Sequence, residues 1–303
     1  MTTGPLSAPV PGIGTEQCDP RYAEIDLWPT GAILDALAEA QMTAVAIVRA
    51  AVPQMEAVVE AALPGLRAGG RLFYVGAGTS GRIGLQDGVE LTPTFGWPGE
   101  RLVLMLAGGP AALFESVEGA EDQEEAARAE ILSHDPGPQD VVLGIAASGA
   151  TPYTCAAIVA ARVCGALTVG VASNPDGRLL REAELGIVLP TGPEVIAGST
   201  RLKAGTAQKA ALNMLSTALM VRLGHAYRGQ MVDMRVVNAK LQRRAARMVR
   251  LLADGTDAQI AEALEATGGN VKRAVLIRHG MSLAEAEAAL RQQGGDLRAV
   301  LGN

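Results

Sequence analysis

The stretch that decides the fold is residues 71–97, RLFYVGAGTSGRIGLQDGVELTPTFGW. It begins with an apolar run of strand-forming residues at 72–75, which ends abruptly at Gly76. A glycine-rich turn follows, and the apolar spacing of Ile83 and Leu85 then indicates the start of a helix. The stretch therefore predicts a strand, a tight turn and a helix in direct succession.

The turn in this stretch carries Gly78, Thr79 and Ser80. Glycine lets the backbone approach a ligand closely, and free N–H groups at a helix start favour an anion. The two hydroxyl groups add donors at the same place. The alternative is an ordinary turn in which a Ser or Thr caps the helix. We predict that these three residues bind an anion.

Residues 76–81 also match the G-x-G-x-x-G pattern of dinucleotide-binding folds. Those folds place an acidic residue about 20 positions further on, at the end of the second strand. Here the second apolar run, residues 102–106, ends in Ala-Gly-Gly at 107–109. The missing acid and the hydroxyl pair favour a terminal phosphate over a pyrophosphate.

Composition argues against several classes of function. The chain has 303 residues, of which 49% are hydrophobic and 19% charged, enough for one large α/β domain and a small one. A net charge of −6 and only 3% aromatic residues argue against a nucleic-acid partner. The three cysteines and three histidines show no metal-ligand spacing, so we expect no metal and no cofactor. No signal pattern or long apolar run is present, so we expect a cytoplasmic protein without a membrane partner.

Strand and helix patterns alternate along the middle of the chain. Strands are expected at 71–76, 102–107, 140–146, 167–172 and 185–189, and helices at 80–88, 111–132, 152–164 and 203–224. Apolar strands between helices predict an α/β fold, a three-layer sandwich with a mainly parallel sheet. Ligands of such folds bind beyond the carboxyl ends of the strands.

The ends of the chain differ from its middle. Residues 1–14 are rich in Pro, Gly and Ser and predict a disordered tail. N-terminal helices and the sandwich are expected to form one domain over 15–250. Short Ala/Leu helices fill 255–303, where the Gly-Gly-Asn at 268–270 recurs as Gly-Gly-Asp at 294–296. This repeat predicts a small helical, UBA-like C-terminal domain.

A second loop repeats the arrangement of strand, turn and helix. Ser148 and Thr151 follow the strand at 140–146, and Pro152 suits the first turn of the next helix. One such loop would be explained by capping alone. Two hydroxyl-bearing loops on parallel strands of one sheet suggest two walls of a phosphosugar pocket.

A third loop precedes the helix at 203–224 with small residues, hydroxyls and two cations. Ser199 lies in this loop, and Arg201 or Lys203 could neutralise a phosphate. The alternative is a solvated helix start.

Two carboxylates are candidates for acid/base chemistry. Glu90 is expected in an apolar loop after the helix at 80–88, near the strand ends. Glu118 and Glu121 would share one face of the helix at 111–132. Acidic residues on a helix are usually solvated, so the sequence pattern alone does not indicate which of these carboxylates is catalytic.

Taken together, six ordered motifs resemble the N-acetylmuramic acid 6-phosphate etherase family, from about Thr15 to the C-terminus. The motifs are GAGTSGR at 76–82, Asp87-x-x-Glu90, PTFG at 93–96, VEGAED at 117–122, GIAASG at 144–149 and RxKAGTAQK at 201–209. The resemblance implies the sugar isomerase (SIS) fold, a cytoplasmic homodimer and no metal. It also implies cleavage of the lactyl ether of N-acetylmuramic acid 6-phosphate, with Glu90 and Glu121 as the catalytic residues.

The chain departs from the family pattern around Glu90. Gly-Val precedes it and Leu-Thr follows it, where Ala-Ser and Cys-Pro are usual. Near the N-terminus Cys18 and Asp19 stand where Arg and Asn are usual, and Tyr22 replaces a small polar residue.

Two alternative functions stay open on the same fold. One is an aldose–ketose isomerase, and the other is a non-catalytic phosphosugar sensor like the regulatory protein of glucokinase.

Overall fold

The computed structural model describes residues 14–302, so the tail predicted at 1–14 lies outside the described residues except for Gly14. The elements of the sandwich are α1 (Thr30–Ala50), α2 (Val52–Arg67), β1 (Leu72–Gly76), α3 (Gly78–Phe95), β2 (Leu102–Leu106), α4 (Glu124–Ser133), β3 (Val141–Ile145), α5 (Pro152–Val163), β4 (Leu167–Ala172), α6 (Arg178–Glu182), β5 (Leu185–Val188) and α7 (Lys203–Arg222). The C-terminal helices are α8 (Ala239–Leu252), α9 (Asp257–Ala266), α10 (Val271–Arg278), α11 (Leu283–Gln292) and α12 (Leu297–Leu301).

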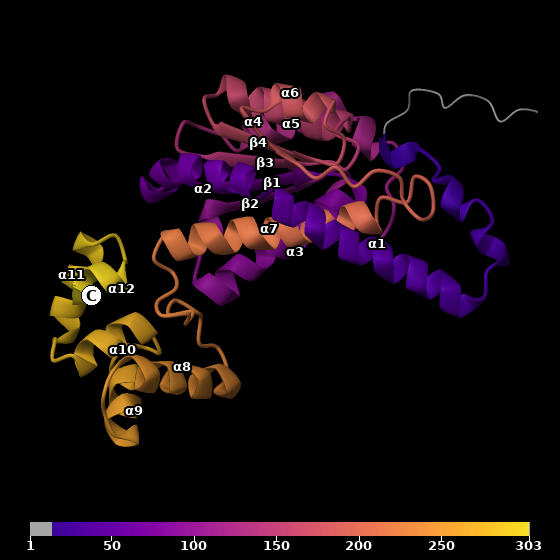
Figure 1. The fold of residues 1–303 in the computed structure, drawn as a ribbon. Coiled ribbons are helices and arrows are strands. Elements are labelled where there is room, and N and C mark those ends of the chain that lie inside the picture. Colours follow the sequence, from indigo (N-terminus) through magenta and orange to yellow (C-terminus); the bar gives the residue numbers. More distant parts are fainter. Residues whose placement is uncertain (1–13, 303) are drawn as a thin grey trace, which may run out of the picture.

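The sheet has five parallel strands in the order β2-β1-β3-β4-β5. Strand β1 shows why helices cover both of its faces. Leu72 and Tyr74 pack into one hydrophobic cluster with α2 and α7, whereas Phe73 and Val75 pack into another with α4, α5 and α6. All five residues of β1 are buried, as in a sheet enclosed by two helical layers. The predicted three-layer sandwich is confirmed (Figure 1).

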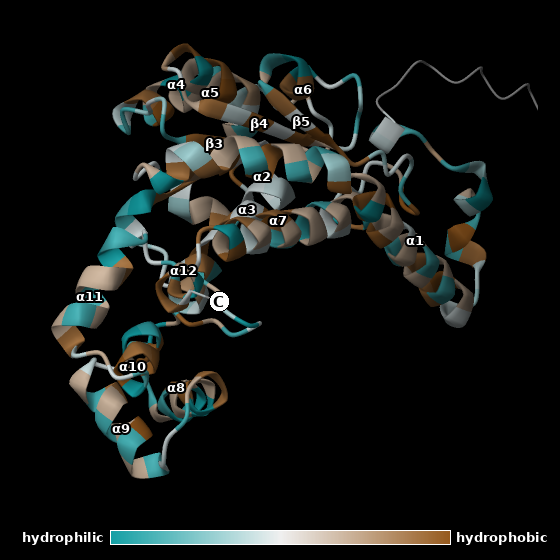
Figure 2. Cartoon of the chain, turned by 60° about the vertical axis from the view of Figure 1, so that its left-hand side comes forward, coloured by the Kyte–Doolittle hydropathy of each residue, from teal (hydrophilic) through white to brown (hydrophobic). Residues whose placement is uncertain are grey.

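Helix α1 extends beyond the sandwich at one side (Figures 1 and 2). Its C-terminal half packs on α7, where Ala44 and Val48 are buried in the core. The rest of its surface exposes large apolar side chains, including Leu34 at 60% and Met42 at 69%. Among the described helices, α1 alone meets the length and apolarity needed to cross a membrane. Its contact with α7 makes it a helix of the sandwich.

The C-terminal helices form their own hydrophobic cluster below the sandwich (Figure 1). This cluster begins at Tyr227 and includes Val249 of α8. A domain boundary near 250, as expected from composition, would therefore cut through the cluster. Helix α8 belongs with the C-terminal helices.

The C-terminal repeat has a structural basis. Thr256 and Ser282 each cap a helix through a capping box, and Asn270 and Asp296 each cap the helix that follows. The glycine pairs at 268–269 and 294–295 adopt positive φ before those second helices. Two copies of a helix, a glycine turn and a second helix are thus packed together.

Two helix predictions are wrong. The range 111–132 is not one helix: a 3-10 turn at Gly109–Leu113 and another at Ala120–Asp122 precede α4. Gly119, with a φ of 69°, stops a helix there, so Glu118 and Glu121 do not share a helical face.

The second wrong prediction concerns Glu90, which lies inside α3 rather than in a loop. The helix was expected to end at residue 88, but α3 continues past Gly88, which packs against β2. A Cβ atom at Gly88 would lie 2.6 Å from Leu104 Cδ2, so the missing side chain lets α3 pack closely against β2. The helix ends at Gly96, which has a left-handed backbone.

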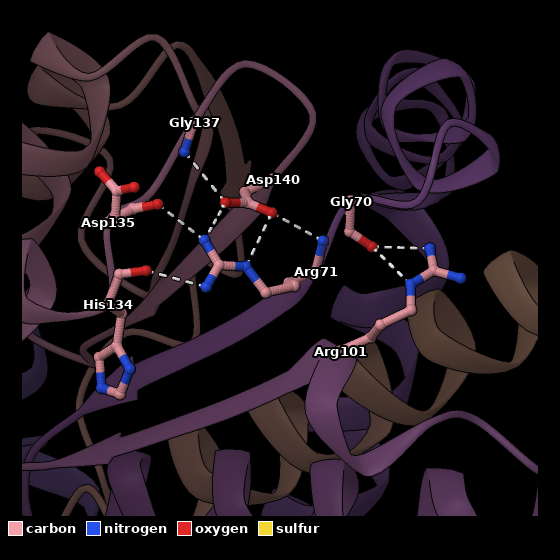
Figure 3. Close-up of polar contacts among 7 residues, drawn as sticks. All are labelled: Gly70, Arg71, Arg101, His134, Asp135, Gly137 and Asp140. Carbon is pink, nitrogen blue, oxygen red and sulfur yellow. Dashed lines mark hydrogen bonds and ion pairs between the residues drawn. The ribbon is translucent and has the colours of Figure 1, made fainter.

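An ion pair joins β1 and β3 at the edge opposite their carboxyl ends (Figure 3). Arg71 Nη2 lies 2.6 Å from Asp140 Oδ2, and the backbone N–H of Arg71 donates to Oδ1 at 2.8 Å. Arg71 also donates to the carbonyls of His134 and Asp135. Burial by itself raises the pKa of Asp140, but the hydrogen bonds from Arg71 and Gly137 outweigh it and hold this pKa below its usual value.

Candidate functional site

The carboxyl ends of β1 and β3 lie side by side at the point where the strand order reverses. Gly76 pairs with Ile145 at the end of both strands. The loop after β1 carries Gly78, Thr79 and Ser80, and the loop after β3 carries Ser148 and Thr151. The structure thus brings both predicted loops to one edge of the sheet, where ligands of such folds bind.

The glycines of the first loop allow α3 to start directly against the strand. A Cβ atom at Gly81 would lie 2.7 Å from the Gly76 carbonyl oxygen, so a larger residue would push the helix away. Gly78 has a φ of 51°, which glycine adopts without strain. No side chain caps α3 at Ala77, so its first N–H groups remain available to an anion.

The two hydroxyl residues of this loop differ in their surroundings. Thr79 is half-buried, and its methyl group packs near Gly205 of α7. Ser80 is buried, and its Oγ donates to Oε1 of Gln208 on α7 at 2.9 Å. Gln208 is fully buried, and within the described chain its Nε2 has no hydrogen-bond partner.

The second loop also ends in a helix start without a side-chain cap, at Thr151. Ser148 is half-buried, and its Oγ accepts the backbone N–H of Ala150 at 3.1 Å. The proton of the Ser148 hydroxyl can therefore point to a ligand. Both loops offer donors and the positive end of a helix dipole.

The start of α7 is different, because a carboxylate occupies it. Glu194 is 1% exposed, and its two oxygens accept the backbone N–H groups of Lys203 and Ala204 at 3.0 and 2.8 Å. Lys203 Nζ donates to the Pro193 carbonyl at 2.7 Å. Ser199 lies half-buried in the preceding loop. Lys203 thus uses one of the three donors of its ammonium group within the chain and keeps its charge, and its role toward a phosphate stays a prediction.

The two candidate carboxylates lie on different elements, and both are exposed in the single chain. Glu121 lies in the 3-10 turn after β2, at the same edge of the sheet as the two loops. Glu90 lies further along α3, ten residues after Ser80. The helix rise places it about 15 Å along the axis from Ser80.

Arg82 connects α3 to the segment that leads to Glu121. Its Nε donates to the Ala112 carbonyl at 2.9 Å, and its Nη2 donates to the Glu115 carbonyl at 3.2 Å. Phe114, between these two carbonyls, is 90% exposed. Arg82 therefore holds a segment that has little apolar burial of its own.

A cleft of about 570 Å³ lies at the other end of α3, between the sandwich and the C-terminal helices. Thr92, Asp233 and Asn270 are among its lining residues. Beside it Lys272, which is 4% exposed, binds Asp233 and the Gly295 carbonyl, and His225 Nδ1 lies 2.8 Å from Asp233. The two hydroxyl-bearing loops are at the opposite end of α3, and the charges beside the cleft are already paired.

The described residues contain no group of three or more His, Cys, Asp or Glu side chains that could hold a metal ion. Cys155 is buried in α5, and burial raises its pKa to about 11, which keeps the thiol protonated at neutral pH.

Known proteins resemble this chain over nearly its whole length. The chain is 52% identical to the N-acetylmuramic acid 6-phosphate etherase of Deinococcus radiodurans over 290 residues, covering 95% of each chain. It is 46% identical to the etherase of Rubrobacter xylanophilus, again over 95% of each chain. The chain belongs to the N-acetylmuramic acid 6-phosphate etherase family.

Domain families and solved structures agree with the fold of this etherase family member. Residues 123–218 match the SIS domain, and residues 54–162 match the glucokinase regulatory protein N-terminal SIS domain. The structure of a phosphoheptose isomerase from Francisella tularensis aligns with a TM-score of 0.50 at 16% identity, covering 64% of this chain and all of that one. This likeness concerns the fold alone.

Three residues of the etherase site region were not singled out from the sequence. Arg82 and Gln208 stand inside motifs that the sequence did mark, 76–82 and 201–209. Their roles depend on contacts with distant segments, so no local pattern reveals them. Glu194 could have been suspected, because an acidic residue before a helix start often caps it.

Proposed function

We propose that this chain cleaves the lactyl ether of N-acetylmuramic acid 6-phosphate, giving N-acetylglucosamine 6-phosphate and D-lactate. Membership in the etherase family carries this proposal. Two uncapped helix starts with free hydroxyls, at the reversal point of a parallel sheet, support a phosphosugar as the ligand. The first wall would consist of Gly78, Thr79 and Ser80, and the second of Ser148 and Thr151.

The reaction needs acid/base groups rather than a metal. In the open-chain sugar the C1 aldehyde acidifies the proton on C2, and a base removes it. The bond from C3 to the lactate oxygen then breaks, and this oxygen takes a proton from an acid. Water adds at C3, and C2 regains a proton, so one water is consumed overall. Glu90 is proposed as the acid that protonates lactate and later activates water, and Glu121 as the base at C2.

The positions of Ser80 and Glu90 support a site shared by two chains. Five bonds link the phosphorus of a hexose 6-phosphate to C3, a span of at most about 7 Å. Glu90 lies about 15 Å along α3 from Ser80, about twice this span, so both side chains would have to extend toward one substrate within a single chain. We infer that Glu90 acts in the site of a second copy.

The exposed surface agrees with such a homodimer. Val89, next to Glu90, is 52% exposed, and α1 exposes Leu34 and Met42. A second copy that covers these apolar side chains would also remove Glu90 from water. We further propose that the homodimer works in the cytoplasm.

The first test is the phosphate dependence of lactate release. N-acetylmuramic acid 6-phosphate should yield D-lactate, and unphosphorylated N-acetylmuramic acid should be a very poor substrate because both loops lose their anion. Equal turnover of the two sugars would contradict the proposal that the two loops bind the phosphate group. A ketose product without lactate would mean that the chain is an isomerase, and binding without turnover would mean that it is a sensor.

Complementation tests the shared site. Glu90→Gln chains and Thr79→Ala/Ser80→Ala chains should each be nearly inactive alone. In a mixed dimer, one of the two sites combines an intact loop with an intact Glu90. About half of the dimers in an equimolar mixture are mixed, so the activity of the mixture should return to about a quarter of wild type. Mixed chains that stay as inactive as the separate ones, while forming dimers, would show that Glu90 acts within its own chain.

A further inference from the structure

The buried contact between Ser80 and Gln208 joins the first turn of α3 to α7. In the structure the Ser80 hydroxyl donates its proton to Gln208 Oε1 at 2.9 Å. A hydroxyl has one proton, so in this state Ser80 cannot also donate to a phosphate oxygen. In this state the Ser80 hydroxyl is therefore not available as a donor to a ligand.

The nitrogen of the Gln208 amide lacks a hydrogen-bond partner in this arrangement. Its Nε2 is buried and has no partner among the described residues, although Gln208 is fully enclosed. A buried donor without a partner raises the free energy of that state. Turning the amide by half a turn would let Nε2 donate to Ser80 Oγ and would leave Oε1, in place of Nε2, as the buried atom without a partner, so either orientation leaves one end of the amide unpaired. The Ser80 proton would then be free for a ligand.

We propose that Gln208 is a positioning residue that directs the Ser80 hydroxyl toward the phosphate when a phosphosugar binds. With the amide turned, Nε2 donates to Ser80 Oγ, and Ser80 donates to the anion. Gln208, Ser80 and the anion are then joined by two consecutive hydrogen bonds, which the ligand-free state lacks. The neighbouring backbone supports this placement, because Gly205, one turn before Gln208, packs against Thr79.

This inference rests on the proposed function only in the binding of a phosphosugar. It is therefore tested by binding rather than by turnover. The probe is N-acetylglucosamine 6-phosphate, titrated by calorimetry into the full chain. Four proteins are compared: wild type, Gln208→Met, Ser80→Ala and the double variant. Met fills the volume of Gln without either polar end.

Gln208→Met should raise the Kd about tenfold, because a hydrogen bond to a charged phosphate loses its directed donor. In the Ser80→Ala background the same substitution should leave the Kd unchanged, since no hydroxyl remains to direct. Ser216→Ala is the control, a buried polar change on the same helix about 12 Å further along. It should leave the Kd as in wild type.

A purely structural role gives a different result. Gln208→Met would then change the Kd equally in both backgrounds, or in neither, while the midpoint of thermal unfolding alone moves. Either outcome overturns the inference. If the wild-type protein binds the phosphosugar and yet releases no lactate from N-acetylmuramic acid 6-phosphate, that result contradicts the proposed function but not the inference about Gln208. Wild type that does not bind the phosphosugar would overturn both.

Discussion

The carboxylate of Glu194 accepts the backbone N–H of Lys203 at 3.0 Å and so caps α7 from within the chain. The same group accepts the N–H of Ala204 at 2.8 Å. Because the negative charge sits at the positive end of the helix dipole, this start needs no external anion. The starts of α3 and α5 have no side-chain cap, and their loops are the two proposed to bind the phosphate.

Replacing Glu194 should destabilise the fold. Glu194→Ala leaves two buried N–H groups at the start of α7 without an acceptor, which should lower the free energy of unfolding by about 1–3 kcal/mol. Urea denaturation measures this change. Glu184→Ala, at an exposed glutamate, is the control and should stay near wild type. A Glu194→Ala protein as stable as wild type would show that the cap contributes nothing.

Asp140 should give the chain an acid-sensitive contribution to stability. Its folded pKa is lowered, so the unfolded chain binds protons more readily than the folded one. The stabilisation is then fully present above the unfolded pKa of about 4 and is lost as the pH falls through and below that value.

Asp140→Asn should remove this contribution and leave Arg71 without its charged partner. We expect a loss of about 3 kcal/mol in the free energy of unfolding at pH 7, and a smaller difference from wild type below pH 4. Urea denaturation at several pH values measures both. Asp176→Asn, at an exposed aspartate, is the control. A difference that stays constant with pH would contradict the ion pair as the cause.

Glu90→Gln should slow the reaction without changing the fold. Glutamine keeps the shape and hydrogen bonding of Glu90 but has no transferable proton, so lactate release should fall about 10²–10⁴-fold. Glu90 is exposed in the single chain, so the unfolding midpoint of each chain should change little. Substrate binding should also persist, because the phosphate loops are intact.

Hydrogen exchange at C2 separates the roles of the two carboxylates. If Glu90 acts only on lactate, the Glu90→Gln protein should still exchange the C2 hydrogen with deuterated solvent. Loss of both exchange and lactate release would make Glu90 the base at C2, or give it both roles. Unchanged lactate release would mean that Glu121 or Glu118, rather than Glu90, acts as the acid.

Chelators should leave the enzyme active. The described residues offer no cluster of metal ligands, and the proposed steps use carboxylates and helix starts. Lactate release is therefore expected to be the same with and without EDTA. Activity that EDTA abolishes and zinc restores would contradict this prediction.

Much of the fold followed from local pattern. The apolar run at 72–75 is buried on both sides of a sheet, and such runs between helical periods occur in parallel sheets. The glycine turn at 76–81 marked the start of α3, because only glycine permits that close packing. The repeated glycine pairs at 268–269 and 294–295 likewise marked the C-terminal units.

The tertiary structure decided what these local signals mean. The first helix was expected to end at residue 88, but α3 continues past Gly88, which packs against Leu104, and Glu90 therefore lies on a helix. The contacts of Lys203 with Glu194 and Pro193, through its backbone N–H and its ammonium group, were not predictable from the sequence. The partner of Ser80 lies 128 positions away. Contacts between distant segments depend on how the layers pack, and no periodicity along the chain encodes them.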